Sequence, residues 1–369
     1  AILPPNPGRS GPRIAMLFPN AGVSVELYLL ILLGVIVGTL GGFFGVGGGF
    51  LITGGLLLFD VPPLFAVGTG LTLIMGTSII NMLKHRRLGH VDLKLGLLMV
   101  CGTIPAEILA ERLNSALEDA GVAGPVIQSV YVVFLLALGL FIIHDYFKTR
   151  RTRVRSGETS TAGLALQVQA LRIPPHSIKI PGLPSLPTYV SLPVSGVERI
   201  SVFIPFLVGF IVGFLAGLLG AGGGFILMPL LVFVVGIPTT VAIGTDLFQI
   251  IITGSVGTFI YSLGNHVDPL MAIIMLIAAS VGSQIGTTAT KFIDAGNIRI
   301  LYGITVLSGC VAIAMKQVAT YSTNLEFLSD MAAYVLLGVA GAMCLVIATL
   351  MVIAIRKQRT GRPTRESVH

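Results

Sequence analysis

Long apolar runs separated by short polar stretches dominate the pattern along this chain. Nine of these runs are near the roughly 20 residues that a helix needs to cross a bilayer. They are residues 23–44, 64–83, 93–111, 126–147, 200–219, 240–263, 269–290, 298–316 and 333–355. Two shorter apolar pieces, 50–60 and 225–237, each follow a glycine cluster and are too short for ordinary spans. The pattern predicts an all-α polytopic membrane protein.

Composition agrees with this class and excludes a soluble domain. Apolar residues make up 54% of the chain and charged residues only 11%, against roughly a quarter in soluble proteins. The net charge of +7 comes from short basic clusters beside apolar segments, which set orientation and contact anionic lipid. No nucleic-acid motif occurs. We therefore expect membrane lipid, and no nucleic acid, as a partner.

The distribution of Lys and Arg predicts the orientation, because both prefer the cytoplasmic side. If the two short pieces cross the membrane, 19 of the 23 basic residues fall on one side; if they re-enter, eight fall on the wrong side. We expect the protein to lie in the inner cell membrane with its N-terminus on the outer side. The mid-chain linker and the C-terminus are then expected in the cytoplasm. No apolar run ending in a cleavage site opens the chain, so no signal peptide is expected.

An internal repeat is the most informative feature of the sequence. Residues 34–50 and 209–225 are identical at 11 of 17 positions, at a shift of 175. A Gly-Thr pair and a His-Val-Asp triplet then recur at a shift of 176. Each unit would have five crossings, an odd number, so the two units would be inverted relative to each other, as in many transporters.

The repeat divides the chain into six parts. We expect an N-terminal lead at 1–22, a first repeat at 23–147, a cytoplasmic linker at 148–199, a second repeat at 200–318, a loop with an extra C-terminal helix at 319–355 and a basic tail at 356–369. The linker is rich in Ser, Thr and Pro, which favours a linker over a domain. A small β-like lid is the alternative.

The repeated motifs resemble those of a known family. The turns GVGGGF and GAGGGF, the elements AVGT and AIGT and the trailing HVD pair are similar to the TauE/SafE family of sulfite and organosulfonate exporters. The resemblance covers roughly 23–147 and 200–318, and implies secondary transport of sulfite or related sulfur-containing anions. This chain differs from the family in having Gly54-Gly55 where a proline is usual; the second copy keeps Pro229. It also differs in its long linker and its extra last helix.

The glycine clusters are the candidate substrate site. Three consecutive glycines cannot hold a lipid-facing helix cheaply, so such a turn persists at membrane depth only inside protein or beside a cavity. Its bare amides, with the N-terminus of the next helix, can converge on an anion. The candidate residues are Gly45, Gly47, Gly48, Gly49, Gly220, Gly222, Gly223 and Gly224. The alternative, close helix packing, is favoured for the four glycines spaced four apart, Gly34, Gly38, Gly209 and Gly213.

Polar residues inside the apolar runs extend this site. The hydroxyls of Thr69 and Thr245 can donate to a sulfonate oxygen or cap a helix. Asp246 stands in an apolar run where the first repeat has Gly70. A carboxylate there repels an anion, so proton coupling suits it better than binding; the alternative is a favourable charge at a helix start. The other path-lining candidates, each also able to bond two helices, are Asn81, Gln249 and Gln284.

Other chemistry-bearing residues receive structural interpretations. Glu107, near a predicted span end, is expected to be a solvated terminus. Asp92 and Asp268 open helices and are expected to cap them. The three cysteines, Cys101, Cys310 and Cys344, lie in apolar runs and are expected to be buried thiols without a metal.

These observations favour a secondary carrier that moves a small anion outward by alternating movement of two repeats. An anion channel with the same turns is the first alternative. An enzyme is disfavoured because no HExxH, Ser/His/Asp set or cysteine pair occurs at helical spacing in the spans. We expect no catalytic residue, no metal and no cofactor; a homodimer is common among such carriers.

Overall fold

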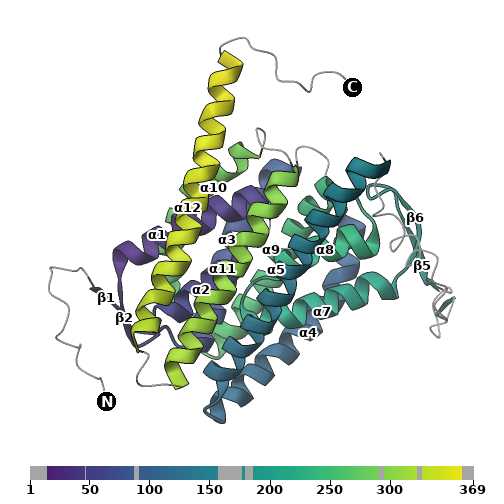
Figure 1. Ribbon diagram of the computed structural model, residues 1–369. Helices are drawn as coiled ribbons and strands as arrows, with labels where there is room; N and C mark the ends of the chain where they lie inside the picture. Colours follow the sequence, from purple (N-terminus) through teal and green to yellow (C-terminus); the bar gives the residue numbers. More distant parts are fainter. Residues whose placement is uncertain are drawn as a thin grey trace.

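The computed structural model describes residues 15–45, 47–86, 91–156, 177–178, 186–290, 295–321 and 326–359. Helices dominate this part of the chain (Figure 1). Eight of the described helices are long and apolar enough to cross a membrane. The prediction of an all-α polytopic membrane protein is confirmed.

The first half opens with a β-hairpin and continues with five helices. The hairpin pairs β1 (Ala15–Phe18) with β2 (Val23–Glu26). The helices are α1 (Leu27–Phe44), α2 (Gly49–Leu58), α3 (Pro63–Arg86), α4 (Leu93–Asp119) and α5 (Ala123–Ser156). The predicted lead at 1–22 therefore contains a strand, and its residues 1–14 lie outside the described part.

The second half repeats this order. Two residue pairs join β3 (Ser177–Ile178) to β4 (Leu186–Pro187), and a second hairpin pairs β5 (Tyr189–Leu192) with β6 (Val197–Ser201). The helices are α7 (Phe203–Leu219), α8 (Gly224–Pro229) with the π-helical η1 (Leu230–Val235), α9 (Thr239–Leu263), α10 (Pro269–Ala289) and α11 (Ala295–Tyr321). The additional helix is α12 (Glu326–Arg359). That the two halves are inverted across a bilayer stays a prediction.

The last residues of the predicted linker form part of a β-hairpin. Strands β5 and β6 are antiparallel, and Leu192 and Ile200 are buried. The hairpins β1–β2 and β5–β6 lie at opposite ends of the helix bundle (Figure 1). Residues 157–176 and 179–185 of the expected linker, and the tail beyond Arg359, lie outside the described part.

Helix α2 turns back along α1. A methyl group added at Gly48 would contact Val37, and one at Gly55 would contact Leu33, so the two helices run antiparallel. With ten residues, α2 is about 15 Å long, about half of a bilayer core. The short piece is thus a half-length helix that leads the chain back toward the side where α1 begins.

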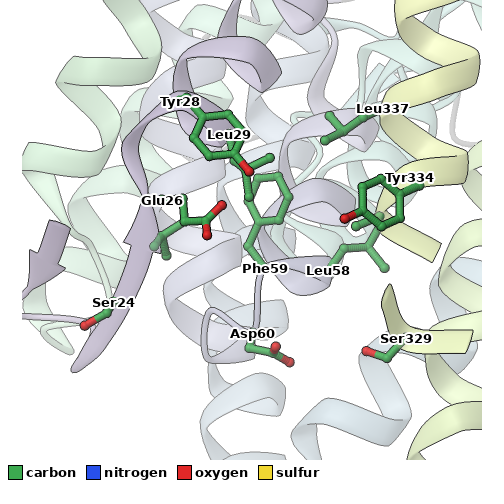
Figure 2. Close-up of a pocket in the computed structure, with 12 residues that line it drawn as sticks. Ser24, Glu26, Tyr28, Leu29, Leu58, Phe59, Asp60, Ser329, Tyr334 and Leu337 are labelled. Atoms are coloured by element: carbon green, nitrogen blue, oxygen red, sulfur yellow. The ribbon is translucent and has the colours of Figure 1, made fainter. Parts of the chain in front are cut away.

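A pocket lies where α2 ends, next to the start of α1. The beginning of α1, the end of α2 and the beginning of α12 line a pocket of about 240 Å³ (Figure 2). Beside it, Asp60 accepts a hydrogen bond from Lys316 at 2.5 Å, and the same ammonium donates to Ser329 at 3.0 Å. The start of α1 and the end of α2 therefore share one face of the molecule, as the predicted sidedness requires.

Glycines join helices from different halves into close pairs. Helix α1 packs on α10, where a methyl at Gly38 would overlap the carbonyl of Ala279. Helix α4 packs on α7, where one at Gly209 would overlap the carbonyl of Met99. Gly34 and Gly213 lie in the same two interfaces. The packing interpretation of the four spaced glycines is confirmed.

Candidate functional site

Both glycine turns need glycine for their backbone conformation. Helix α1 ends at Phe44 and is capped by Gly45, with φ of 73°, and the turn continues through positive φ angles at Gly47 and Gly48. The second turn has positive φ at Gly220, Gly222 and Gly223. Side chains other than glycine rarely adopt this conformation. The repeated sequence therefore encodes one sharp break in the same place in each half.

The two turns meet in the interior of the protein. A methyl at Gly49, the first residue of α2, would overlap the carbonyl oxygen of Ala221 in the other turn. Gly47 and Gly222 each lie against the same two side chains, Ile74 of α3 and Ile250 of α9. The described residues of both turns are buried. The breaks thus face each other inside protein and not toward lipid.

The turns leave backbone donors unused. Within the described residues, the N–H groups of Gly47, Gly48 and Gly222 form no hydrogen bond, whereas that of Gly45 donates to Gly41. The first N–H groups of a helix also have no partner inside the helix. Free amides at the start of α2 can therefore bind an oxyanion.

Two hydroxyl residues of α3 lie at the first turn. Thr77 donates to the carbonyl of Ile74 at 3.1 Å and approaches that of Gly47 at 3.5 Å. The Ser78 hydroxyl is buried beside Gly47 and has no partner among the described residues. Ser78 is not among the site residues predicted from the sequence. Its counterpart in the repeat is Gly254, so the two halves differ in polarity here as they do at Gly70 and Asp246.

Thr69 and Thr245 hold the starts of helices in the opposite half. The hydroxyl oxygen of Thr69 accepts the N–H of Asp268, and that of Thr245 accepts the N–H of Asp92, both at 3.0 Å. Each aspartate also caps its own helix, as predicted, because its carboxylate accepts the N–H of the residue three positions later. These contacts give both threonines a structural role in the observed conformation.

Asp246 is buried beside the first turn. Its carboxylate is fully buried and has no hydrogen-bond partner among the described residues. A methyl added at Gly45 of the first turn would lie 2.8 Å from the side chain of Ile243, which is one turn before Asp246 on α9. Asp246 therefore lies near the glycines. It is the eighth residue of α9, beyond the first turn, so the interpretation as a favourable charge at a helix start is wrong.

The three amide residues, Gln249, Asn81 and Gln284, differ in burial and in hydrogen bonding. Gln249 donates through its amide nitrogen to Thr103 of α4, while its amide oxygen is buried without a described partner. Asn81 accepts from Ser283 of α10 at 2.5 Å. Gln284 is exposed. Asn81 and Gln249 thus bond helices of opposite halves.

Two sequence expectations are wrong. Glu107 is not a solvated terminus: α4 continues to Asp119, which puts Glu107 in mid-helix with 1% of its surface exposed. Its carboxylate has no partner among the described residues. Cys101 is exposed on the outer side of α4, whereas Cys310 is buried and Cys344 partly so. Both errors arise because an apolar run does not tell which side of a helix faces protein.

Taken together, these features define a polytopic helical membrane protein in which two glycine turns meet in the interior. A family model described as "Sulfite exporter TauE/SafE" matches residues 30–315. The chain belongs to this family.

Similar proteins in other organisms carry transporter names. The chain is 25% identical over 295 residues to the probable membrane transporter protein YunE of Bacillus subtilis, covering 78% of this chain and 97% of the relative. It is 25% identical over 293 residues to the probable membrane transporter protein MJ0441 of Methanocaldococcus jannaschii, covering 74% and 90%. A shorter match, 37% over 81 residues, joins it to the probable membrane transporter protein YjnA of Bacillus subtilis, covering 22% and 32%. No solved structure matches the chain.

Proposed function

We propose that this protein is a secondary transporter that exports a small sulfur-containing anion, such as sulfite or an organosulfonate, in exchange for protons. The anion would bind between the two glycine turns, and Asp246 would carry the coupling proton. Family membership supports membrane transport. The observation that carries the proposal is the buried meeting of the two turns, one from each repeat, with backbone amides left without partners.

The site chemistry fits an oxyanion better than a cation or an apolar solute. The amides of Gly47, Gly48 and Gly222 and the hydroxyl of Ser78 are donors, and the three glycines carry no side chain that would obstruct approach. A sulfite or sulfonate group offers three acceptor oxygens to such donors. Because no Lys or Arg of the described part contributes to this cluster, the positive end of α2 supplies the attraction.

The arrangement of helices supports alternating access. The glycine-rich pairs α1–α10 and α4–α7 each combine helices from both halves and are closely packed. We infer that each pair moves as a unit. The contact between Gly49 and Ala221 must open to admit an anion, so relative movement of the units would expose the turns to one side at a time.

Transport in proteoliposomes tests the proposal. Wild-type protein should accumulate labelled sulfite against its gradient when a pH gradient is imposed, and the rate should saturate with sulfite concentration. Asp246→Asn should abolish this pH-driven accumulation and retain sulfite exchange at equal pH, because the amide cannot carry a proton. Flux that neither saturates nor responds to the pH gradient would indicate a channel and contradict the carrier.

Substrate class is tested by thermal stability in detergent. Sulfite, thiosulfate, sulfoacetate and taurine are compared with carboxylates of matched size. A bound ligand raises stability by RT ln(1 + [L]/Kd), so the transported anion should raise the unfolding temperature selectively. An equal response to the carboxylates would contradict selectivity for sulfur oxyanions.

A further inference from the structure

Buried polar side chains form a continuous line between α4 and α9. They are four, seven or eight residues apart, which is one or two helical turns, so each set lies on one face of its helix. On α4 they are Thr103, Glu107 and Asn114, and on α9 they are Gln249, Thr253 and Tyr261. We call these six residues the polar seam. All are essentially excluded from solvent.

Hydrogen bonds tie the two ends of the polar seam across the interface. At one end Gln249 donates to Thr103, and Thr253 donates to the Gln249 carbonyl at 2.9 Å. At the other end Asn114 donates to the Tyr261 phenol at 2.7 Å. The Tyr261 hydroxyl in turn donates to the carbonyl of Gly217 at 3.0 Å. Both ends are therefore anchored, and Glu107 lies between them.

Glu107 is the one member of the polar seam with a carboxylate. It packs against glycines on both neighbouring helices, Gly217 of α7 and Gly257 of α9, and a methyl at Gly257 would lie 3.2 Å from its Oε1 atom. The titratable residue of α9 in the polar seam is Tyr261, whose hydroxyl bonds to Asn114 and to Gly217 and not to Glu107. Glu111, one turn on, accepts instead from Ser115 at 2.9 Å. Glu107 forms no ion pair within the described residues.

The equivalent interface in the other half has no carboxylate. By the repeat shift of 176, Glu107 corresponds to Ser283, and Gly257 corresponds to Asn81. Ser283 and Asn81 bond directly to each other between α10 and α3. In one half, the serine and the asparagine at this place are hydrogen-bonded to each other. In the other half, the same place holds a buried acid without a partner among the described residues. Packing alone does not require the acid, because the same fold is built without it.

An unpaired carboxylate buried inside a membrane protein is costly, and such residues mark ion and proton pathways. Asp246 lies on the same face of α9, about 16 Å from the level of Gly257 by the helical rise. Gln249 and Thr253 occupy the turns between. The polar seam therefore extends from the coupling candidate toward the end of the molecule where α4 and α9 finish.

We propose that Glu107 is a second proton-carrying residue of this transporter, and that the polar seam connects it with Asp246. Glu107 takes up one proton to become a neutral carboxylic acid and releases the same proton in each cycle. This proposal rests on the proposed function, since it assigns a route to the proton that drives anion export.

Infrared spectroscopy of the detergent-purified protein tests the proton on Glu107 without any transport. Protonated carboxyls have a distinct carbonyl band, and the pH-dependent part of this band should lose one component in Glu107→Gln. The matched control is Glu111→Gln, which removes the same charge one turn away and should leave that component unchanged. A band that is identical in wild type and Glu107→Gln would overturn the proposal.

Transport then separates this proposal from the function itself. Glu107→Gln should lose pH-driven sulfite accumulation and keep exchange, as Asp246→Asn does, while Glu111→Gln should accumulate sulfite like wild type. Loss in Asp246→Asn with full accumulation in Glu107→Gln would overturn the role of Glu107 and leave the carrier intact. Wild-type protein without pH-driven accumulation would overturn both.

A second variant tests whether a loss of transport in Glu107→Gln is caused by misfolding. Glu107→Ser combined with Gly257→Asn copies the Ser283–Asn81 pair into the α4–α9 interface, where a serine-to-asparagine bond already has a precedent in this fold. A side chain added at position 257 would lie 2.7 Å from the Leu71 Cδ1 atom, so the end of the Leu71 side chain must turn aside. The double variant should fold and still lose pH-driven accumulation. Retained accumulation in the folded double variant would contradict a proton-carrying role.

Discussion

Gly49 shows how little space separates the two turns. It lies at the first position of α2 without a positive φ, so its backbone conformation would accept alanine. Its neighbour decides otherwise, because the carbonyl of Ala221 occupies the place of a β-carbon. The contact is between two backbones, and a backbone cannot rotate away as a side chain can. The glycine is therefore required by the neighbouring repeat.

We predict that Gly49→Ala destabilises the protein by about 1–3 kcal/mol, because the added methyl forces the two turns apart. Thermal unfolding in detergent measures the change. Gly338→Ala in α12 is the control: no atom lies within 4 Å of the added methyl, and the substitution should stabilise the helix by up to about 1 kcal/mol. Equal unfolding temperatures for the two variants would show that the turns are not in contact.

The sequence alone does not tell whether an individual acidic side chain is buried. Asp246 was identified because it interrupts an apolar run, whereas Glu107 was assigned to a helix end because charged neighbours follow it. In the structure both acids are buried without described partners. What distinguishes Glu107 from Glu111 is the side of α4 on which each lies, and that depends on where α7 and α9 pack.

At the level of elements, the starts of α4 and α10 form a natural comparison. Asp92 and Asp268 each cap a helix and each donate a backbone N–H to a threonine of the other half. Asp92 also accepts from Ser195 of the β5–β6 hairpin at 2.6 Å. The corresponding oxygen of Asp268 has no described partner. The second hairpin thus secures one helix start more firmly than the first hairpin secures the other.

We predict that Asp92→Ala lowers stability more than Asp268→Ala. Loss of a cap costs about 1 kcal/mol in both, and loss of a hydrogen bond to a charged group adds about 1.5–3 kcal/mol for Asp92. Unfolding temperatures of the purified variants measure the difference. In a Ser195→Ala background the two aspartate substitutions should become nearly equal; an undiminished difference would mean that Ser195 does not support the cap.

On the scale of the whole molecule, the two hairpins indicate how the protein lies in the membrane. Asn20 in the first hairpin lies beside the loop before α10, and Ser195 in the second is bonded to the start of α4. These ends are opposite in Figure 1. The distribution of basic residues predicts that the end with β5–β6 faces the cytoplasm.

We predict that cysteines placed in the two hairpins react from opposite sides of the membrane. In a variant without the three native cysteines, Asn20→Cys should react with an impermeant thiol reagent added outside intact cells, and Val194→Cys only after the membrane is permeabilised. Both positions are exposed. Asp119→Cys, at the end of α4, is a second outer-side position. Labelling of Asn20→Cys and Val194→Cys from one side would contradict the inverted arrangement.

The sequence by itself determined the class of protein, the repeated unit, the breaks at the glycine turns and the helix caps. Each depends on hydropathy or on local backbone conformation, and both are properties of a short stretch of chain. The tertiary structure decided that α2 turns back along α1, that the two turns touch and that the helices pair across halves. It also decided which acids are buried. These depend on tertiary contacts: those between α1 and α2 join residues 11 and 22 positions apart, and those between the turns and between the halves join residues more than a hundred positions apart. A local sequence pattern does not contain the free energy of such contacts.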